Sequence, residues 1–292
     1  MLNVWRGDDP SFLQESIQSI TSQTSRPDEF VIVADGPLND QIETVLSIFS
    51  SDITKVVRLP GNRGLAQARN YGLLEMSSEY VLVQDADDIS HPQRLEVCRA
   101  VIGASPGGVT VLSADMHMFE SSSRRIVSTR RAVEDEAQLR KALRFRNPIN
   151  HPTVMIDRHR FLTTGGYRTI DRLEDYATWA HLLRIPAVSF KFLPLPLVAF
   201  RMTDDYYRRR GGVKLLRSEF ELQKLLKQTI SEPPNFAHKF SRLCFTTSPS
   251  SVRKQLDKLL SKKNDLRNVN ELSSFLCSSI ILRCHTEGDP SS

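Results

Sequence analysis

Along the first half of this chain, segments whose apolar residues have helical spacing alternate with short apolar runs that are typical of strands. Residues 11–24 place apolar side chains at helical spacing, and residues 30–34 form a short apolar run that ends in Asp-Gly-Pro, which is typical of a buried parallel strand followed by a turn. The alternation continues and predicts a helix over 40–49, a strand over 54–59, a helix over 65–76 and a strand over 80–84. Strands separated by such helices predict a parallel sheet with helices on both faces and ligands beyond the carboxyl ends of the strands.

Three carboxylates follow the strand at 80–84 directly, at Asp85, Asp87 and Asp88. Crowded carboxylates repel one another and raise each other's pKa unless a cation compensates, so a divalent metal is a natural partner. Oxygen ligands favour Mg²⁺ or Mn²⁺ over zinc, and a metal held by one or two carboxylates takes its other ligands from phosphates and water. A solvated acidic turn is the alternative. Asp35, which ends the strand at 30–34, favours a site because both strand ends lie at the same edge.

A second pair of acids begins a helix that is predicted from the apolar spacing of residues 173–183. Glu174 and Asp175 lie on its first turn, where carboxylates interact favourably with the helix dipole and often do no more than cap the helix. A glycine turn at 163–168 lies just upstream and favours placement of this helix start in a pocket. The capping role and a role in a site therefore both stay open.

Composition excludes several classes of protein. The sequence contains neither Gly-x-Gly-x-x-Gly nor Gly-x-x-x-x-Gly-Lys-Ser/Thr, so neither a dinucleotide-dependent dehydrogenase nor a P-loop enzyme is indicated. Its 4 cysteines have no CxxC spacing and are interpreted as ordinary thiols rather than as a zinc site or a disulfide framework. No apolar run approaches the roughly 18 residues of a membrane span, and the N-terminus lacks a signal pattern, which predicts a cytoplasmic protein.

The net charge of +5 is distributed unevenly. Residues 201–264 hold 15 Lys or Arg against 6 Asp or Glu, a local excess that suits an anionic membrane, phosphorylated substrates or nucleic acid. A solvated helical face is the alternative, and nucleic acid is not favoured because no recognised binding motif accompanies the charge. Residues 213–228 form an amphipathic pattern with Leu215, Leu216, Phe220, Leu222 and Leu226 on one face. This helix is expected to pack on the parent domain, with a membrane surface as the second possibility.

Five segments, in order and spacing, resemble family 2 glycosyltransferases with the GT-A fold over about residues 1–210. They are 33–37, 62–70, 85–88, 165–167 and 174–179. The chain is most similar to bacterial transferases that build O-antigen, capsule or exopolysaccharide units, partly because of residues 208–212 and the helix that follows them. The resemblance implies an α/β GT-A fold with a mostly parallel central sheet flanked by helices. It also implies a transferase domain over 1–210. The charge and the amphipathic pattern that follow predict a helical basic extension over 211–264, and residues 265–292, where the resemblance ends, are expected to form a loose or short helical tail.

The resemblance also implies roles for individual residues. Asp35 would accept the imide hydrogen of uracil, Arg69 would face the base or its phosphates, and Asp85 would bind the ribose. Asp87 would ligate Mg²⁺ or Mn²⁺, which bridges the diphosphate of a UDP-sugar. Asp175 would be the general base that takes the proton from an acceptor hydroxyl during an inverting attack.

Glu174 would orient the start of its helix or the acceptor. The implied donor is a UDP-hexose, and the implied acceptor is a saccharide carried on a lipid at the inner face of the plasma membrane, where basic residues would give peripheral contact. Arg201 and Arg208–Arg210 either close over the diphosphate or form a solvated loop.

Two departures from the family pattern keep alternatives open. The family often has two adjacent acids where this chain has Ala34-Asp35, and the first strand, over residues 1–5, is short. A shortened strand would expose backbone groups of its neighbours, so a nucleotide-sugar binding protein without useful turnover is one alternative. A sugar nucleotidyltransferase is another, although residues 6–10 are a poor substitute for its glycine-rich loop.

Overall fold

The computed structural model describes residues 1–203 and 213–229. The N-terminal part alternates strand and helix as β1 Leu2–Val4, α1 Pro10–Thr21, β2 Phe30–Ala34, α2 Asp40–Ile48, β3 Thr54–Arg58, α3 Leu65–Leu74 and β4 Tyr80–Leu82. The elements that follow are β5 Ile89–Ser90, α4 Arg94–Gly103, β6 Val111–Glu120, β7 Ile126–Arg130, α5 Glu136–Leu143, the 3-10 turn η1 His151–Thr153, β8 Met155–Asp157, α6 Arg158–Thr163, α7 Glu174–Leu182, β9 Phe190–Met202 and α9 Val213–Thr229.

The predicted alternation in the first half is confirmed, with small shifts at the ends of elements. Strand β2 has the predicted bounds, and all five of its residues are buried. Helix α1 begins at Pro10 because the Asp9 carboxylate accepts the first free N–H groups of the helix. Strand β4 ends two residues early, at Leu82, and Gln84 instead forms an isolated parallel bridge with Leu2.

Strand β1 lies at the point where the strand order reverses, because β2 and β3 follow on one side of it and the chain then crosses to β4 on the other side. Strands β1, β2 and β3 pair in parallel in that order, and a second set runs β4-β8-β6-β9-β5 with β7 beside β6. The Leu2–Gln84 bridge joins the two sets. In open sheets of this kind ligands bind beyond the carboxyl ends of the strands at such a switch point. Asp35 and Asp85 both lie at this edge, as predicted.

The short first strand is paired on both sides. The N–H of Asp35 donates to the carbonyl of Val4 at 2.8 Å, and the N–H of Gln84 donates to the carbonyl of Met1 at 2.9 Å. The exposed backbone that the sequence predicted for the neighbours of this strand is therefore not observed along Leu2–Val4.

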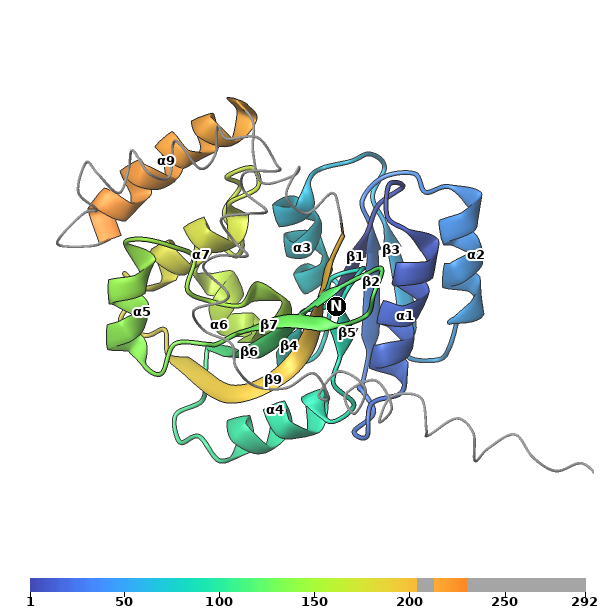
Figure 1. The fold of residues 1–292 in the computed structure, drawn as a ribbon, viewed down its shortest axis with the longest axis horizontal. Coiled ribbons are helices and arrows are strands. Elements are labelled where there is room, and N and C mark those ends of the chain that lie inside the picture. The colour runs from blue at the N-terminus through green and yellow to red at the C-terminus, as the bar shows by residue number, and fades with distance from the viewer. Residues whose placement is uncertain (204–212, 230–292) are drawn as a thin grey trace, which may run out of the picture.

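The second half of the sheet has mixed pairing. Strands β6 and β9 are parallel over most of their length, whereas β8 and β7 run antiparallel to β6 and β5 runs antiparallel to β9. Figure 1 shows α1 and α2 on one side of the N-terminal strands, with α6 and α7 beside the central strands. The parallel pairing predicted from the first half therefore holds from β3 through β2 and β1 to the bridge at Gln84, and the sheet continues as a mixed one.

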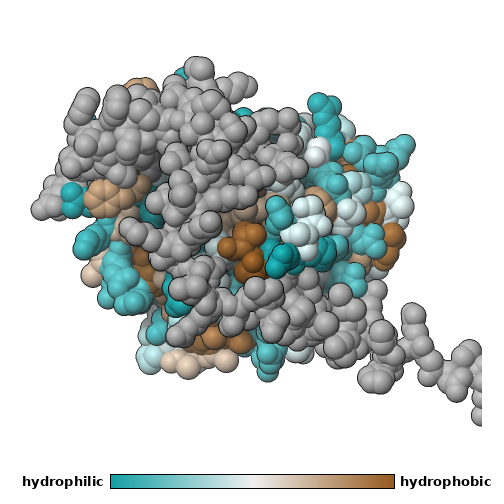
Figure 2. Space-filling model, in the orientation of Figure 1, coloured by the Kyte–Doolittle hydropathy of each residue, from teal (hydrophilic) through white to brown (hydrophobic). Residues whose placement is uncertain are grey.

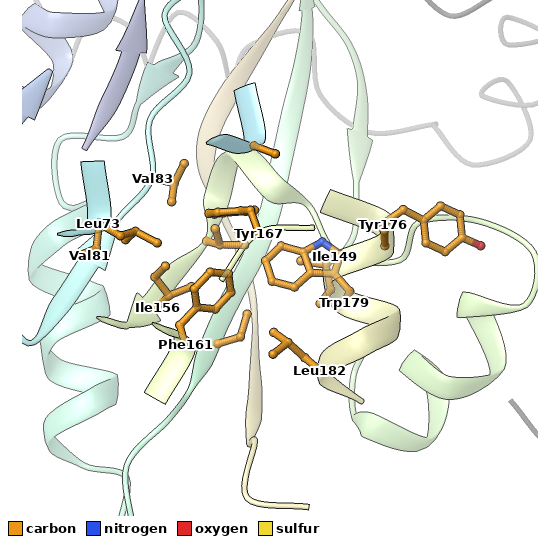
Figure 3. Packing of buried hydrophobic residues seen from close by; sticks show 14 of the residues in the cluster. Leu73, Val81, Val83, Ile149, Ile156, Phe161, Tyr167, Tyr176, Trp179 and Leu182 are labelled. Atoms are coloured by element: carbon orange, nitrogen blue, oxygen red, sulfur yellow. The ribbon is translucent and has the colours of Figure 1, made fainter. Parts of the chain in front are cut away.

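Aromatic side chains form the centre of the core. Phe161, Tyr167 and Trp179 lie together in Figure 3, with ring centroids 4.9 Å apart for Phe161 and Tyr167 and 6.4 Å apart for Tyr167 and Trp179. His151 is part of this cluster, and its Nε2 lies 3.1 Å from the Tyr167 hydroxyl. Burial lowers the pKa of His151 well below its usual value. This histidine is therefore a neutral core residue.

Helix α9 packs against α7, and Figure 1 shows it along the outer side of that helix. Its buried side chains Leu215, Ser218, Leu222 and Leu226 recur at helical spacing. Phe220 is 68% exposed, so its predicted place on the apolar face was wrong, because that face runs through Ser218 instead. Figure 2 shows hydrophobic patches separated by hydrophilic residues on the coloured part of one face. Among the described helices, none is long and apolar enough to span a membrane.

Candidate active site at the carboxyl edge of the sheet

Asp35 holds the loop that leads into α3. Its Oδ1 accepts the backbone N–H of Arg63 at 2.6 Å, and its Oδ2 accepts that of Gly64 at 3.0 Å. Gly64 is the N-cap of α3 and has no side chain that can cap the helix, so the Asp35 carboxylate places negative charge at the helix start. Each carboxylate oxygen can accept a second hydrogen bond, so the predicted contact with uracil is compatible with this arrangement and stays a prediction.

Arg69 joins two parts of the chain that are distant in sequence. Its guanidinium lies on α3 and is buried, with Nη2 at 2.9 Å from Asp85 Oδ1 and Nη1 at 3.4 Å from Glu174 Oε1. The Tyr167 ring lies below it, with the ring centroid 5.4 Å from the guanidinium carbon. The structure therefore brings Arg69, Asp85 and Glu174 together, and in this state the arginine pairs with protein carboxylates.

The segment Asp85–Asp88, here called the acid turn, is held by its backbone. Gln84 donates its side-chain amide to the carbonyls of Asp85 at 3.3 Å and Asp88 at 2.8 Å, and Ser16 donates its hydroxyl to the carbonyl of Asp85 at 2.7 Å. Asp85 is partly exposed and Asp87 is half-buried, whereas Asp88 is fully buried. The acid turn therefore presents Asp85 and Asp87 at the edge of the sheet and places Asp88 beneath them.

Asp88 is the buried member of this group of acids, and its pKa is shifted. Burial, followed by repulsion from Asp87 and Asp85, raises the pKa of Asp88 well above its usual value. Its Oδ1 accepts the backbone N–H of Arg201 at 2.9 Å, and its Oδ2 has no hydrogen-bond partner in the described part of the chain. The raised pKa therefore favours the protonated form of this buried carboxyl.

The acid turn fits a divalent cation that is shared with a substrate. No group of three or more His, Cys, Asp or Glu residues within 1–203 and 213–229 forms a closed metal site. A magnesium-type cation needs only one or two carboxylates when phosphate oxygens and water supply the remaining ligands. Asp85 and Asp87 offer oxygen donors of the kind that Mg²⁺ and Mn²⁺ prefer, beside the buried Asp88, whose Oδ2 has no hydrogen-bond partner among the described residues.

The predicted acidic helix start is observed, because α7 begins at Glu174. Burial first, and then repulsion from Asp175, raises the pKa of Glu174 to about 7, although Arg69 opposes the shift. Burial also raises the pKa of Asp175, against hydrogen bonding and the nearby positive charges of Arg69 and Arg130. Both acids of this pair therefore hold protons more tightly than exposed carboxylates do.

Two hydrogen bonds orient the Asp175 carboxylate. Asn147 donates its amide to Oδ2 at 2.6 Å, and the backbone N–H of Tyr176 donates to Oδ1 at 2.7 Å. The amide oxygen of Asn147 accepts the N–H of Ile149 at 3.3 Å, which fixes the direction in which the amide group points. Asn147 was not among the predicted site residues, and the only signal in the sequence was its place before the Pro-x-Asn-His-Pro segment.

The glycine turn upstream of α7 docks this helix against α3. Asn70 accepts the N–H of Tyr167 at 2.8 Å and donates to its carbonyl at 3.0 Å. Gly166 has a φ of +67°, and a Cβ at this position would lie 2.4 Å from the Asn70 side-chain oxygen. The close approach explains how residues 165–167 bring Glu174 and Asp175 to Arg69.

Arg201 does not lie in a solvated loop, which corrects one of the two predictions for it. It is 2% exposed near the end of β9, and its Nη2 is 2.7 Å from Glu15 Oε2. The residues Arg208–Arg210 lie outside the described part of the chain.

Comparison with known proteins agrees with this geometry. The sequence model described as "Glycosyl transferase family 2" matches residues 6–163. An uncharacterized glycosyltransferase of Haemophilus influenzae is 32% identical over 263 residues, which cover 88% of this chain and 96% of that protein. The Escherichia coli UDP-Gal:alpha-D-GlcNAc-diphosphoundecaprenol beta-1,3-galactosyltransferase is 30% identical over 226 residues, which cover 76% of this chain and 80% of that protein.

Solved structures show the same fold. S. aureus TarS in complex with UDP has a TM-score of 0.56 at 18% identity, covering 84% of this chain and 68% of that one. TarS in complex with UDP-GlcNAc has a TM-score of 0.58 at 16% identity, covering 95% of this chain and 78% of that one. Fold, order of motifs and sequence similarity agree: this chain belongs to glycosyl transferase family 2 and has the GT-A fold.

Proposed function

We propose that this protein transfers a hexose, with inversion, from a UDP-sugar to a hydroxyl of a lipid-linked saccharide during synthesis of a cell-surface polysaccharide. The observation that carries the proposal is Arg69, which holds Asp85 of the acid turn and Glu174 of α7 within one network. This network links the acid turn, which we propose binds the donor, to the start of α7, which carries the proposed base Asp175 next to Glu174. The Escherichia coli relative, whose name states a UDP-Gal donor and a diphosphoundecaprenol-linked acceptor, supports the substrate classes.

In this proposal the acid turn and the loop after β2 bind the donor. Asp35 would accept a hydrogen bond from the uracil, Asp85 would bind the ribose, and Asp87 would hold Mg²⁺ or Mn²⁺. When bound, such a cation neutralises negative charge that develops on the departing diphosphate. Arg69 supplies further positive charge beneath Asp85.

Asp175 is the proposed base. It accepts the proton of the acceptor hydroxyl while that oxygen forms a bond to the sugar C1 and the bond from C1 to the diphosphate oxygen breaks. Attack from the face opposite the diphosphate inverts the anomeric configuration. The bonds from Asn147 and from the backbone N–H of Tyr176 favour the ionised carboxylate that this step needs, against the effect of burial. Glu174 titrates with Asp175 as a pair and orients the start of α7.

The proposed location follows from the acceptor. A lipid-linked saccharide at the inner face of the plasma membrane requires the enzyme to reach that surface, and each Lys or Arg near an anionic membrane contributes about 1 kcal/mol. We therefore propose a cytoplasmic protein whose transferase domain covers residues 1–210 and whose basic extension over 211–264 gives peripheral contact. Helix α9 packs on α7, and residues 230–264 lie outside the described part of the chain.

The test measures UDP release from UDP-galactose and UDP-glucose with and without Mn²⁺. We expect Mn²⁺-dependent turnover of at least one donor by the unmodified protein and loss of the metal response in Asp87→Asn. Asp28→Asn is the matched control, because Asp28 forms a surface pair with Arg99 and its side chain is 82% exposed. Binding of UDP with Mn²⁺ and no turnover of either donor, with or without a saccharide acceptor, would support a binding protein instead.

A further inference from the structure

The side chain of Arg201 connects β9, α1 and the acid turn, and the roles predicted for the site residues do not account for this connection. It lies near the end of β9, with Nε donating to the backbone carbonyl of Asp87 at 2.7 Å and Nη2 donating to Glu15 of α1 at 2.7 Å. The chain around it adds a further link, because its own backbone N–H donates to Asp88 at 2.9 Å. One residue therefore ties β9 and α1 to the second half of the acid turn.

The surroundings of this guanidinium keep it rigid. Its central carbon lies 4.2 Å from the ring centroid of Phe12 and 4.8 Å from that of Phe119, so the cation contacts the faces of two aromatic rings. Glu15 is fixed in turn by Arg124, whose Nη1 lies 3.1 Å from both of its carboxylate oxygens. Because these contacts leave Arg201 few rotamers, its bond fixes the Asp87 carbonyl relative to α1 and β9.

The nature of the contact determines what Arg201 can do. It holds Asp87 through the backbone carbonyl rather than through the carboxylate, so this contact orients the residue without using a carboxylate oxygen. On the opposite side of the turn, Arg69 holds Asp85 through its carboxylate. The acid turn is thus fixed at both ends by buried arginines from different parts of the chain.

We propose that Arg201 is a positioning residue that sets the orientation of Asp87 for the divalent cation, with Glu15 as its anchor. This inference rests on the proposed function, because it assumes that Asp87 holds the cation. Residues that orient metal ligands through hydrogen bonds typically change metal affinity about 10- to 100-fold when they are replaced. Arg201 acts on the cation site through Asp87 and contacts neither substrate in this scheme.

The experiment measures the dissociation constant of Mn²⁺ by calorimetry in the presence of saturating UDP, for the full chain and its variants. Arg201→Gln removes both side-chain contacts and keeps the backbone bond to Asp88. Arg201→Lys keeps the charge but cannot reach both oxygens with the fork geometry of a guanidinium. We expect both variants to raise the Mn²⁺ constant about 10-fold or more. Glu15→Gln should raise it by less, because the anchor is weakened but not removed.

The control is Arg158→Gln, which removes a similar bond at the other end of β4. The Nε of Arg158 donates to the carbonyl of Ser78 at 2.8 Å, so its loss should lower the melting temperature without changing the Mn²⁺ constant. If the Arg201 variants also lower the melting temperature and leave the Mn²⁺ constant unchanged, Arg201 is only structural and the inference is overturned. If Arg201→Gln does not fold, an unchanged constant in Arg201→Lys and Glu15→Gln overturns it equally. Failure of the unmodified protein to bind Mn²⁺ with UDP would refute the proposed function instead.

Discussion

The protonation of Glu174 should be visible as a pH-dependent stability. Replacing Glu174 by Gln keeps the size of the side chain and an oxygen that can accept from Arg69, and it removes the ionisable group. The carboxyl is 13% exposed, lies 3.4 Å from Arg69, and has its pKa raised from 4.5 to about 7. A shift of this size corresponds to about 3 kcal/mol, at roughly 1.36 kcal/mol for each pKa unit.

The sign follows from the direction of the shift. Because folding raises the pKa, the folded protein holds this proton more tightly than the unfolded chain does. The stabilisation is therefore fully present below pH 4.5, the pKa of the unfolded chain, and it is lost as the pH rises through about 7. Between pH 5 and pH 8 the unmodified protein should lose about 2 to 3 kcal/mol relative to Glu174→Gln. Asp175 titrates with its neighbour, so the difference belongs to the pair.

The assay is urea unfolding of both proteins without nucleotide or metal, followed by tryptophan fluorescence at several values of pH from 5 to 8. The quantity to compare is the difference in unfolding free energy between variant and unmodified protein at each pH, which cancels the titration of other groups. Glu136→Gln is the control, because Glu136 forms an exposed pair with Arg140 on α5 and such pairs contribute little. A difference that stays flat for Glu174→Gln, or that shifts in favour of the unmodified protein as the pH rises, would refute the reasoning.

Three further predictions concern the base, a buried arginine and a glycine. Asp175→Asn should lower turnover about 10²- to 10⁴-fold while UDP binding measured by calorimetry stays unchanged; similar losses of both would contradict its role as base. Arg94→Met should lower the unfolding free energy in urea by about 3 kcal/mol or more, because Nη2 of this fully buried side chain donates to the carbonyls of Val83 and Pro152 at 2.9 and 2.8 Å. Gly36→Ala should cost more than about 1 kcal/mol in the same assay, because φ is +91° and the added Cβ would lie 2.8 Å from a backbone nitrogen; a neutral result would contradict the strain.

The parts of the fold that the sequence predicted are those with a local cause. Strand β2 has the expected bounds because a continuous apolar run ends at Asp35-Gly36, where the chain must turn. Helix α7 begins at Glu174, where the apolar spacing placed two acids on a first turn. Both features depend on a few neighbouring residues, so their signals are present in a short window of sequence.

The parts that could not be predicted depend on contacts between distant segments. Strand β8 lies between β4 and β6 and reverses the direction of the sheet there, and nothing in its three residues specifies those neighbours. The same holds for Arg201, whose partners Glu15 and Asp87 are 186 and 114 residues away in the sequence. An arginine usually lies at the surface, and only the assembled sheet shows that this one is buried.

The candidate site could be predicted in part. The types of its residues and their positions at strand ends can be read from a short window of sequence, whereas the charges that surround them come from distant segments. Arg69 reaches the carboxylate of Asp85, but Arg94 donates to the Gln84 side chain and to the Val83 carbonyl, and Arg201 donates to the carbonyl of Asp87. Arg201 therefore holds the acid turn through a backbone oxygen, and Arg94 holds the two residues that precede the turn, rather than any of its carboxylates.

The crowding of three acids in one turn favours the binding of a cation. Burial, followed by repulsion from Asp87 and Asp85, raises the pKa of Asp88, although Arg69 and Arg201 hold the turn from either side. A cation that arrives with a diphosphate would place positive charge beside these carboxylates and bring its own counter-charge with it. We therefore expect Mn²⁺ and UDP together to raise the melting temperature by more than the sum of their separate effects. Additive shifts would show that the acid turn does not need the cation to receive the nucleotide.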